Sequence, residues 1–294
     1  MKSGFVSIVG RPNVGKSTLL NTLLERKIAI TSNVSGTTRN IIQGIYNDDD
    51  SQIVFIDTPG IHKPVNKLGA VMNNQAYQMI DEVDIILFLL DVTKPFGKGD
   101  QFVLDKVKDL NKPVFLILNK VDLIDKNKLF ELITNYSSLY DFKEIIPISS
   151  IKNDNIDDLI KTIKKYLPRE EILYDPEMVT NISTDFYIAE VVREKLLRLT
   201  KDEVPHTVTC LVESFEDCET YYDIQVLIIV DRENLKKIII GKNGQMLKKV
   251  GIYARSDIEE FLGKQVNLKT YVKVIEDWRE KEKYLRELGF YELK

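Results

Sequence analysis

Nine consecutive residues near the start of the chain have types and spacing suited to binding phosphate. They read Gly10-Arg11-Pro12-Asn13-Val14-Gly15-Lys16-Ser17-Thr18. The glycines let the backbone wrap around a polyphosphate, so that the N–H groups of the loop face its negative charge. Lys16 adds a mobile cation for the β- and γ-phosphates, and the Ser17 hydroxyl can ligate Mg²⁺. The pattern predicts a phosphate-binding loop.

The flanking residues support this prediction. Phe5–Val9 is a short apolar run with β-branched residues, and the leucines at positions 19, 20, 23 and 24 fall on one face of a helix. Strand, glycine loop and helix, in this order, distinguish a phosphate loop from a glycine turn that packs and binds nothing.

A second motif, Asp57-Thr58-Pro59-Gly60, follows the apolar run Ile53–Ile56. An aspartate at a strand end beside a phosphate loop can hold Mg²⁺, usually through water. The backbone N–H of Gly60 can approach the γ-phosphate. Alone, this motif would be interpreted as a Pro-Gly turn, but the phosphate loop before it favours the metal role.

A third motif, Asn119-Lys120-Val121-Asp122, follows the run Val114–Leu118. The Asp122 carboxylate can accept hydrogen bonds from N1–H and the exocyclic amine of guanine, whereas adenine presents an acceptor at N1. A carboxylate left unpaired in this way discriminates by up to about 10⁴–10⁵-fold in comparable sites. The alternative is a polar loop in which Asp122 caps a helix.

Two weaker motifs complete the set. Ser149-Ser150 follows the run Ile145–Ile148, and the backbone N–H after Ser149 is placed to meet the guanine carbonyl. The polar stretch Ser35-Gly36-Thr37-Thr38-Arg39-Asn40 offers a threonine that can complete the Mg²⁺ shell when a γ-phosphate is bound. Thr38 is the first choice and Thr37 the second.

The elements that position these motifs alternate along the first part of the chain. The predicted strands are Phe5–Val9, Ile41–Tyr46, Ile53–Ile56, Ile85–Leu90, Val114–Leu118 and Ile145–Ile148. The predicted helices are Lys16–Leu24, Gly69–Ile80, Gln101–Asp109, Lys128–Tyr140 and Ile156–Tyr166. Apolar strands between helices indicate an α/β domain with a doubly wound, mostly parallel sheet. Such sheets bind ligands at the carboxyl ends of their strands.

Composition limits the class of protein. The chain has 294 residues, of which 44% are hydrophobic and 29% charged, as is typical of a soluble globular protein. Its formal net charge of −4 makes a global basic field impossible, so any nucleic-acid site must be a local patch. The two cysteines lack metal-ligand spacing, and no signal peptide or membrane-spanning run is recognisable. We therefore expect a cytoplasmic protein.

Taken together and in this order, the motifs closely resemble those of the translation-factor-like GTPases. The phosphate loop and the triplet Thr37-Thr38-Arg39 are similar to those of the Era family. The resemblance implies Mg²⁺-dependent hydrolysis of GTP to GDP and phosphate, with slow intrinsic turnover. It also implies that Asn13 holds a K⁺ ion near the phosphates, with Arg39 as a weaker candidate for supplying the positive charge.

One departure from Ras-like GTPases concerns the attacking water. Ile61 stands where those enzymes carry a glutamine, and an apolar side chain cannot orient water. Era proteins share this apolar residue. A lone loop histidine such as His62 is more often incidental than catalytic, so no general base is evident. The residues expected to act in hydrolysis are Lys16, Thr38, Gly60 and Asn13, with Ser17, Thr38 and Asp57 as the Mg²⁺ ligands.

The pattern changes in the second half of the chain. Residues 1–168 are predicted to form the GTPase domain, 169–184 a linker, and 185–294 a second domain. There the predicted helices are Asp185–Thr200, Asn234–Ile240, Gln245–Leu262 and Asp277–Leu288. The predicted strands are Val208–Val212, Tyr222–Val230 and Val266–Val274. This order resembles a smaller α+β type-two KH domain.

Gly241-Lys242-Asn243-Gly244 supplies the GxxG loop of such a domain, which clamps about four nucleotides of a sugar-phosphate chain. Residues 232–255 carry seven basic side chains and one acidic one, whereas residues 202–231 carry eight acidic and no Lys or Arg. The patch indicates RNA binding by the GxxG loop together with Lys248 and Lys249. The alternative is a nucleotide-gated adaptor whose KH-like domain binds protein.

The family resemblance implies the partners. The RNA would be the 3′ end of 16S ribosomal RNA, and the function would be assembly of the small ribosomal subunit. The resemblance also implies peripheral association with the inner face of the cell membrane, for which the sequence itself contains no signal. A further alternative is a binding module that holds GTP without turning it over.

Overall fold

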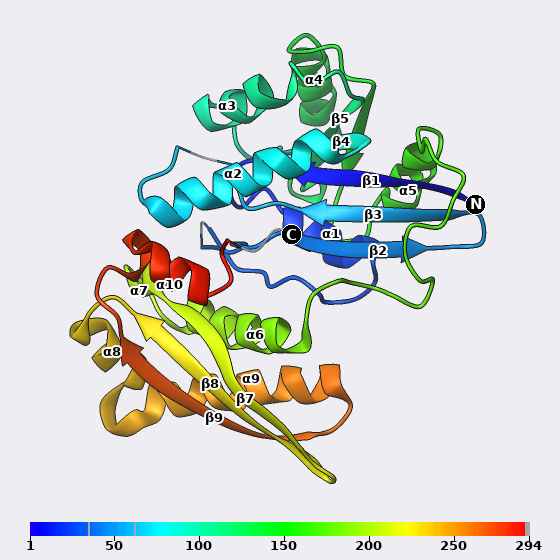
Figure 1. Cartoon of the computed structure of the whole chain (residues 1–294). Helices are drawn as coiled ribbons and strands as arrows, with labels where there is room; N and C mark the ends of the chain where they lie inside the picture. The colour runs from blue at the N-terminus through cyan, green and yellow to red at the C-terminus, as the bar shows by residue number, and fades with distance from the viewer. Residues whose placement is uncertain (35, 62, 292–294) are drawn as a thin grey trace. The chain divides into compact units, whose positions relative to one another are not determined.

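The computed structural model describes residues 1–34, 36–61 and 63–291 (Figure 1). The chain divides into two compact units. The first unit contains Met1–Ala29, Thr38–Pro64 and Met72–Asn181, and the second contains Ile30–Thr37, Val65–Val71 and Ile182–Lys294. Two short segments from early in the sequence are therefore part of the second unit.

The first unit is built, within the described residues, on a six-stranded sheet. Its strands are β1 (Lys2–Val9), β2 (Ile42–Asn47), β3 (Ser51–Asp57), β4 (Ile85–Asp91), β5 (Val114–Asn119) and β6 (Glu144–Ile148). They lie in the order β2-β3-β1-β4-β5-β6. The pair β2–β3 is antiparallel, and the pairs β1–β3, β1–β4, β4–β5 and β5–β6 are parallel. This confirms the predicted mostly parallel α/β sheet.

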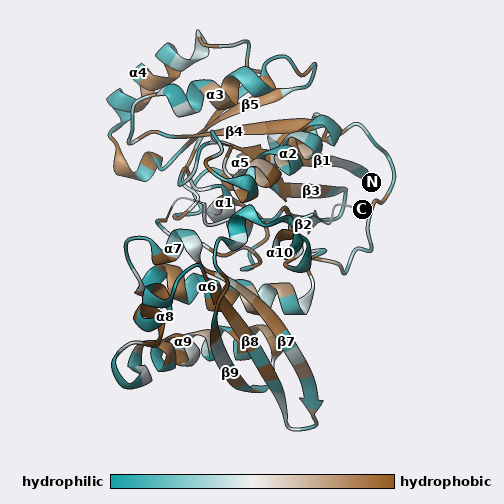
Figure 2. Cartoon of the chain, turned by 60° about the vertical axis from the view of Figure 1, so that its left-hand side comes forward, coloured by the Kyte–Doolittle hydropathy of each residue, from teal (hydrophilic) through white to brown (hydrophobic). Residues whose placement is uncertain are grey.

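Helices cover both faces of this sheet. They are α1 (Lys16–Leu23), α2 (Lys67–Glu82), α3 (Lys98–Val107), α4 (Lys126–Ser137) and α5 (Ile156–Lys164). Helices α2, α3 and α4 share one buried cluster with the strands, through residues such as Ile80, Leu104 and Leu132. Every residue of β3, β4 and β5 is buried, which explains the continuous apolar runs Ile53–Ile56, Ile85–Leu90 and Val114–Leu118 within them. Figure 2 shows β4 as hydrophobic along its length.

The segment predicted as a linker instead belongs largely to the first unit, which extends to Asn181. Gln52 Oε1 accepts hydrogen bonds from the backbone N–H groups of Leu173 (2.8 Å) and Tyr174 (2.9 Å). The backbone N–H of Ile45 donates to Val179 O over 2.8 Å. These hydrogen bonds to β2 and β3 join the segment to the first unit, and we call residues 169–181 the strap.

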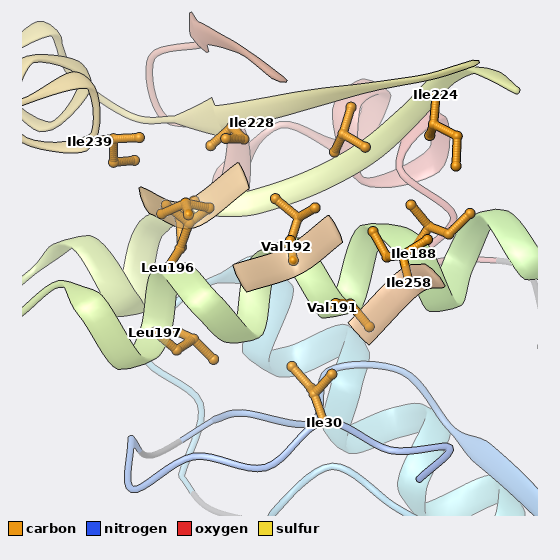
Figure 3. Close-up of a cluster of buried hydrophobic side chains, with 14 of the residues drawn as sticks. Ile30, Ile188, Val191, Val192, Leu196, Leu197, Ile224, Ile228, Ile239 and Ile258 are labelled. Atoms are coloured by element: carbon orange, nitrogen blue, oxygen red, sulfur yellow. The ribbon is translucent and has the colours of Figure 1, made fainter. Parts of the chain in front are cut away.

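Among its described residues, the second unit is a three-stranded sheet with helices packed on it. Its elements are α6 (Thr184–Leu199), α7 (Val204–Thr207), β7 (Thr209–Cys218), β8 (Tyr221–Val230), α8 (Glu233–Ile240), α9 (Gln245–Leu262), β9 (Gln265–Val274) and α10 (Glu282–Glu287). The strands lie in the order β7-β8-β9, with β7–β8 antiparallel and β8–β9 parallel. The buried cluster between sheet and helices contains Ile188, Val192, Ile228 and Ile258 (Figure 3).

Two elements of the second unit differ from their predicted bounds by more than one residue at an end. Strand β7 continues to Cys218, past the predicted end at Val212, because a bulge between Val212 and Ser214 shifts the side-chain alternation that marks a strand. The predicted final helix is interrupted after Trp278–Glu280. Trp278 is fully buried and its Nε1–H donates to Thr207 O over 2.8 Å, so packing fixes this segment more strongly than helix propensity does.

Candidate nucleotide and nucleic-acid sites

The phosphate loop joins β1 to α1 at the carboxyl end of β1. Gly15 has φ = 104°, in the region that favours glycine. A Cβ atom there would lie 2.3 Å from Asn119 Nδ2, which itself donates to Val14 O over 2.8 Å. A side chain at position 15 would therefore displace the asparagine that ties the phosphate loop to the end of β5.

Lys16 is 6% exposed, and its ammonium group points into the loop. Its Nζ donates to Gly10 O over 3.1 Å and to Arg11 O over 3.3 Å. Burial lowers the pKa of Lys16, and the negative charge of Asp57 opposes this. Two carbonyl oxygens compensate a buried ammonium only in part, so the loop is suited to a bound anion.

Three side-chain oxygens that could ligate a metal come from distant parts of the sequence of the first unit and meet beside the phosphate loop. Ser17 Oγ donates to Asp57 Oδ2 over 2.6 Å, and Thr38 Oγ1 lies 2.7 Å from Ser17 Oγ and 3.3 Å from Asp57 Oδ2. Asp57 is fully buried. Burial raises its pKa, while Lys16, Ser17 and Thr38 act in the opposite direction.

These donors fit a magnesium ion. Mg²⁺ prefers hard oxygen ligands and keeps several waters. Asp57 Oδ1 is buried and has no hydrogen-bond partner within the described part of the chain, as expected of an oxygen that faces a hydrated cation. Ser17, Thr38 and Asp57 are thus the residues that would hold it.

The alternative ligand, Thr37, points elsewhere. Its hydroxyl donates to Val34 O over 2.7 Å and lies 2.6 Å from Ser32 Oγ, within its own loop. The geometry therefore favours Thr38, the first choice from the sequence. Ser35 and His62 lie outside the described residues. Ile61 is 1% exposed and belongs to the core, so its side chain is unavailable to water.

The residues predicted to recognise guanine meet at the ends of β5 and β6. Ser149 Oγ donates to Asp122 Oδ1 over 2.5 Å, and Asp122 remains exposed toward solvent. The backbone N–H of Ser150, predicted to meet the guanine carbonyl, donates instead to Asn119 Oδ1 over 3.1 Å. In this arrangement the guanine carbonyl would have to compete with Asn119 for that donor.

Sequence reasoning missed Asp91, the last residue of β4. Its Oδ2 lies 2.6 Å from Lys120 Nζ, and Lys120 Nζ also donates to Asn13 O over 3.0 Å. Its Oδ1 accepts from Thr93 N (3.0 Å) and Thr93 Oγ1 (2.6 Å). Asp91 thereby fixes the side chain of Lys120 against the phosphate loop. An acidic residue directly after a fully apolar strand was the available signal.

The GxxG loop of the second unit connects α8 to α9. Gly241 has φ = 70° and Gly244 has φ = 74°, and Asn243 between them has φ = 52°. A Cβ atom at Gly241 would lie 2.7 Å from Met246 Cβ. The loop is therefore held in a conformation that depends on its glycines, with Lys242 and Asn243 exposed.

A groove of about 340 Å³ follows this loop along α9 and β9. It is lined by Gly244, Leu247, Lys248, Gly251, Ile252, Arg255, Asn267, Leu268 and Thr270. Of the predicted lysines, Lys248 lines the groove. Lys249 lies over the ring of Tyr253 instead, with its Nζ 5.8 Å from the ring centroid.

Among the groove residues that were not predicted as contacts are Ile252 and Arg255. Ile252 is an exposed isoleucine (51%) among polar neighbours, which gives the groove an apolar surface for a base. Both follow Lys248 at helical spacing, at positions i+4 and i+7, and that periodicity was the signal available in the sequence.

Comparison with known proteins assigns both units. The family described as 50S ribosome-binding GTPase matches residues 5–120, and the KH domain family matches residues 203–279. GTPase Era of Clostridium botulinum is 47% identical over 290 residues, which cover 98% of this chain and 98% of that protein. This chain belongs to the Era family of GTPases. GTPase Era of Clostridium tetani is also 47% identical, over 291 residues.

Solved Era structures agree with this Era-family GTPase over its whole length. A tyrosine-to-alanine variant of Aquifex aeolicus Era bound to GDP·AlF4⁻ has a TM-score of 0.96 at 43% identity and covers 99% of each chain. Era in complex with MgGDPNP and nucleotides 1506–1542 of 16S ribosomal RNA has the same TM-score and identity. The fold and the GTPase activity expected from the motifs are thereby confirmed.

None of the helices in the described residues is both long enough and apolar enough to cross a bilayer.

Proposed function

We propose that this Era-family GTPase binds the 3′ end of 16S ribosomal RNA through its second unit, in a manner set by its nucleotide, and acts in small-subunit assembly. The observation that carries the proposal is the exposed glycine loop at Gly241–Gly244, which opens onto the groove beside α9. A solved relative with this fold holds MgGDPNP and nucleotides 1506–1542 of 16S ribosomal RNA.

The geometry of the nucleotide site supports a separate role for each of its residues. Lys16 would hold the β- and γ-phosphates, because its buried ammonium has two carbonyl acceptors among the described residues and can take a further anion. The backbone N–H of Gly60 would support the γ-phosphate; a Cβ there would come within 2.9 Å of Pro12 Cγ, so only glycine lets the two loops approach this closely. Ser17, Thr38 and Asp57 would hold Mg²⁺, which neutralises charge that develops on the phosphate oxygens.

The base would lie between Lys120 and the carboxylate of Asp122. The Asp91–Lys120 ion pair keeps the lysine side chain extended over the phosphate loop, and Ser149 orients Asp122. Asp122 would accept the N1–H and the exocyclic amine of guanine, which adenine does not offer in that arrangement. The site is therefore selective for GTP and GDP over their adenine counterparts.

The groove beside α9 suits a single-stranded RNA. Bare backbone at Gly241 and Gly244 lets a sugar-phosphate chain approach, while Lys242, Lys248 and Arg255 supply positive charge. Ile252 and Leu268 provide apolar contact for unstacked bases. The local positive charge resolves the apparent conflict with a chain whose net charge is −4.

The test is crosslinking in living cells, followed by sequencing of the RNA held by the protein. We expect reads concentrated at the 3′ end of 16S ribosomal RNA, and their loss when Lys242 and Asn243 are both replaced by Asp. A crosslinked protein partner in place of RNA would favour the adaptor function and overturn the proposal.

The location is also part of the proposal: cytoplasmic, with the peripheral association at the inner face of the membrane that the family resemblance implies. Fractionation of cells in low and high salt tests it, because an electrostatic attachment is released by salt. A protein that stays in the cytosolic fraction in both salts would contradict the membrane association.

A further inference from the structure

The segment before β2 belongs structurally to the second unit. We call residues 30–37 the switch loop; it precedes Thr38, the metal-site threonine, in the chain. Ile30 is 1% exposed and shares the buried cluster of the second unit with Val191 and Leu197 on α6 (Figure 3). The switch loop is therefore anchored in the same core that supports the RNA groove.

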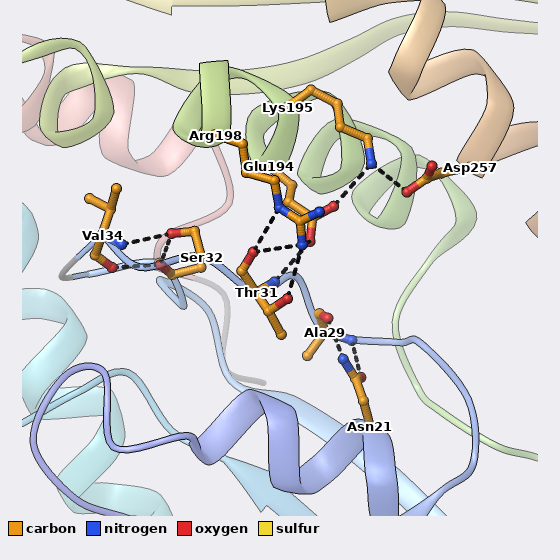
Figure 4. A network of polar contacts seen from close by, with 10 residues as sticks. Asn21, Ala29, Thr31, Ser32, Val34, Glu194, Lys195, Arg198 and Asp257 are labelled. Carbon is orange, nitrogen blue, oxygen red and sulfur yellow. Dashed lines mark hydrogen bonds and ion pairs between the residues drawn. The ribbon is translucent and has the colours of Figure 1, made fainter. Parts of the chain in front are cut away.

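Both backbone groups of Thr31 are bound by side chains of α6. The Thr31 N–H donates to Glu194 Oε1 over 3.0 Å. Arg198 donates to Thr31 O from Nε (3.3 Å) and from Nη2 (3.2 Å), and its Nη2 also donates to Glu194 Oε1 over 2.9 Å. Figure 4 shows Thr31, Glu194 and Arg198 joined in this way.

The far end of the switch loop is held by the same helix. Arg193 is fully buried, and its Nη2 donates to Thr37 O. Its guanidinium is fixed by Glu190, which accepts from Nε and Nη2 at 2.6 Å each. Helix α6 thus holds the loop at Thr31 and at Thr37.

The second oxygen of Glu194 continues the network toward the RNA groove. Lys195 Nζ donates to Glu194 Oε2 over 3.2 Å and to Asp257 Oδ2 over 2.5 Å. Asp257 lies on α9, the helix that begins at the GxxG loop and lines the groove with Lys248, Ile252 and Arg255. Glu194 is the member of this chain of contacts that touches both the loop and the link to α9 (Figure 4).

Because Glu194 is buried, breaking its hydrogen bonds to the switch loop or to Lys195 costs free energy. Glu194 is fully buried, and a buried carboxylate is tolerated only while its hydrogen-bond partners are in place. If the switch loop moves away, Glu194 loses the Thr31 donor, and Arg198 and Lys195 remain among the groups that compensate its charge. Since Lys195 also holds Asp257, the position of α9 responds to the position of the loop.

We propose that Glu194 is the positioning residue that couples the switch loop to the RNA-binding helix α9. This inference rests on the proposed RNA-binding function. A GTP-bound state that keeps Thr38 at the metal site keeps the adjoining switch loop on α6, and Glu194 and Lys195 then hold α9 in its RNA-binding position. Loss of the γ-phosphate releases Thr38 and then the switch loop. Glu194 and Lys195 then no longer restrain α9.

The experiment measures RNA affinity in GDP and in GDPNP at one fixed salt concentration, with a fragment of the 3′ end of 16S ribosomal RNA as the probe. The quantity compared is the ratio of the two affinities. We expect a ratio of about 5–150 for the unaltered chain, the range of typical coupling between sites. For Glu194→Gln, which keeps the shape and removes the charge, we expect a ratio near one, with GDP affinity unchanged.

A purely structural role for Glu194 would weaken both affinities together and leave their ratio unaltered. Lys195→Met is the second variant, which spares the contact with Thr31 and breaks the link to α9. We expect it also to bring the ratio of the two RNA affinities to about one. The matched control is Asp217→Asn, which removes a carboxylate paired with Lys264 elsewhere in the second unit and should keep the full ratio.

The outcomes separate this inference from the proposed function. An unaltered chain that binds no RNA in any state overturns both. RNA binding with a ratio near one in the unaltered chain, or with a full ratio retained in both Glu194→Gln and Lys195→Met, overturns the coupling inference and leaves the RNA-binding function standing.

Discussion

Ser17 Oγ donates a hydrogen bond to Asp57 Oδ2 over 2.6 Å, although the two residues are 40 positions apart in the sequence. Ser17 lies in the first turn of α1 and Asp57 ends β3. Thr38 Oγ1 reaches the same hydroxyl from the segment before β2. We propose that hydrolysis of GTP depends on this convergence, because each oxygen alone is an ordinary polar group.

Thr38→Ala should slow GTP hydrolysis by about 10–100-fold, a loss typical of removing a partner around a bound metal. GDP affinity should change little, because the threonine is needed only when the γ-phosphate is present. Single-turnover hydrolysis and GDP titration measure the two effects. Thr37→Ala is the control, since its hydroxyl bonds within its own loop. Equal losses in both variants would show that Thr38 has no special role.

Asp122→Asn should weaken GTP binding and favour xanthosine triphosphate. Xanthine presents a carbonyl where guanine has its amine, and the amide of asparagine can donate to it. Competition between the two nucleotides for the variant and for the unaltered chain measures the change. A variant that still prefers GTP would rule out Asp122 as the guanine-binding residue.

Hydrolysis should be faster in KCl than in NaCl at equal ionic strength. Ile61 is buried and cannot orient water, so we expect positive charge near the phosphates to come from a K⁺ ion held by Asn13 and the switch backbone. Asn13→Ala should remove the difference between the salts. Equal rates in both salts for the unaltered chain would end this hypothesis.

The Asp91 carboxylate should make stability depend on pH. Burial tends to raise its pKa, but the hydrogen bonds from Lys120 and Thr93 and the lysine charge together hold it below its ordinary value. The stabilisation is therefore present above the ordinary range of an aspartate and is lost as pH falls through the folded-state pKa. At pH 7, Asp91→Asn should be destabilised by about 1–3 kcal/mol, the usual range for charged hydrogen bonds.

Scanning calorimetry measures this, with about 2–4 °C of Tm expected for each kcal/mol. The difference in Tm between Asp91→Asn and the unaltered chain should become smaller as the pH is lowered from 7 toward 3. Asp105→Asn is the control, because its partner Lys108 is exposed and such pairs contribute little. A difference in Tm that is independent of pH would show that charge is not the source of the effect.

The strands, the phosphate loop and the motifs at the strand ends could be predicted because local sequence patterns mark them. The apolar runs that became β4 and β5 are continuous because both faces of those strands are buried, and the phosphate loop is recognisable because Gly15 has no substitute beside Asn119. The motifs at the ends of the strands were found because parallel strands share one carboxyl edge.

What the sequence did not reveal depends on tertiary contacts. The anchoring of Thr31 by Glu194 joins residues 163 positions apart, and no local pattern marks either of them. The Asp91–Lys120 pair depends on the register of β4 against β5, in which Asp91 lies opposite Asn119. The strap at 169–181 looked like a linker because its hydrogen bonds to β2 and β3 join residues far apart in the sequence.

RNA binding should depend on the glycine loop of the second unit. Lys242→Asp combined with Asn243→Asp should abolish RNA affinity through repulsion of the phosphates, while GTP affinity in the absence of RNA stays unchanged because the predicted nucleotide-binding residues belong to the first unit. This double variant is the control for the measurement below. RNA binding that survives both substitutions would show that the loop is not the binding site.

The most direct test of nucleotide-controlled RNA binding is one titration series. The affinity for the 16S 3′-end fragment is measured with GDP, with GDPNP and Mg²⁺, and without nucleotide, at one fixed salt concentration because phosphate contacts are salt-dependent. We predict binding about 5–150-fold tighter with GDPNP than with GDP, and, by reciprocity, GDPNP bound tighter by the same factor when RNA is present. Identical RNA affinities in all three states would contradict the account.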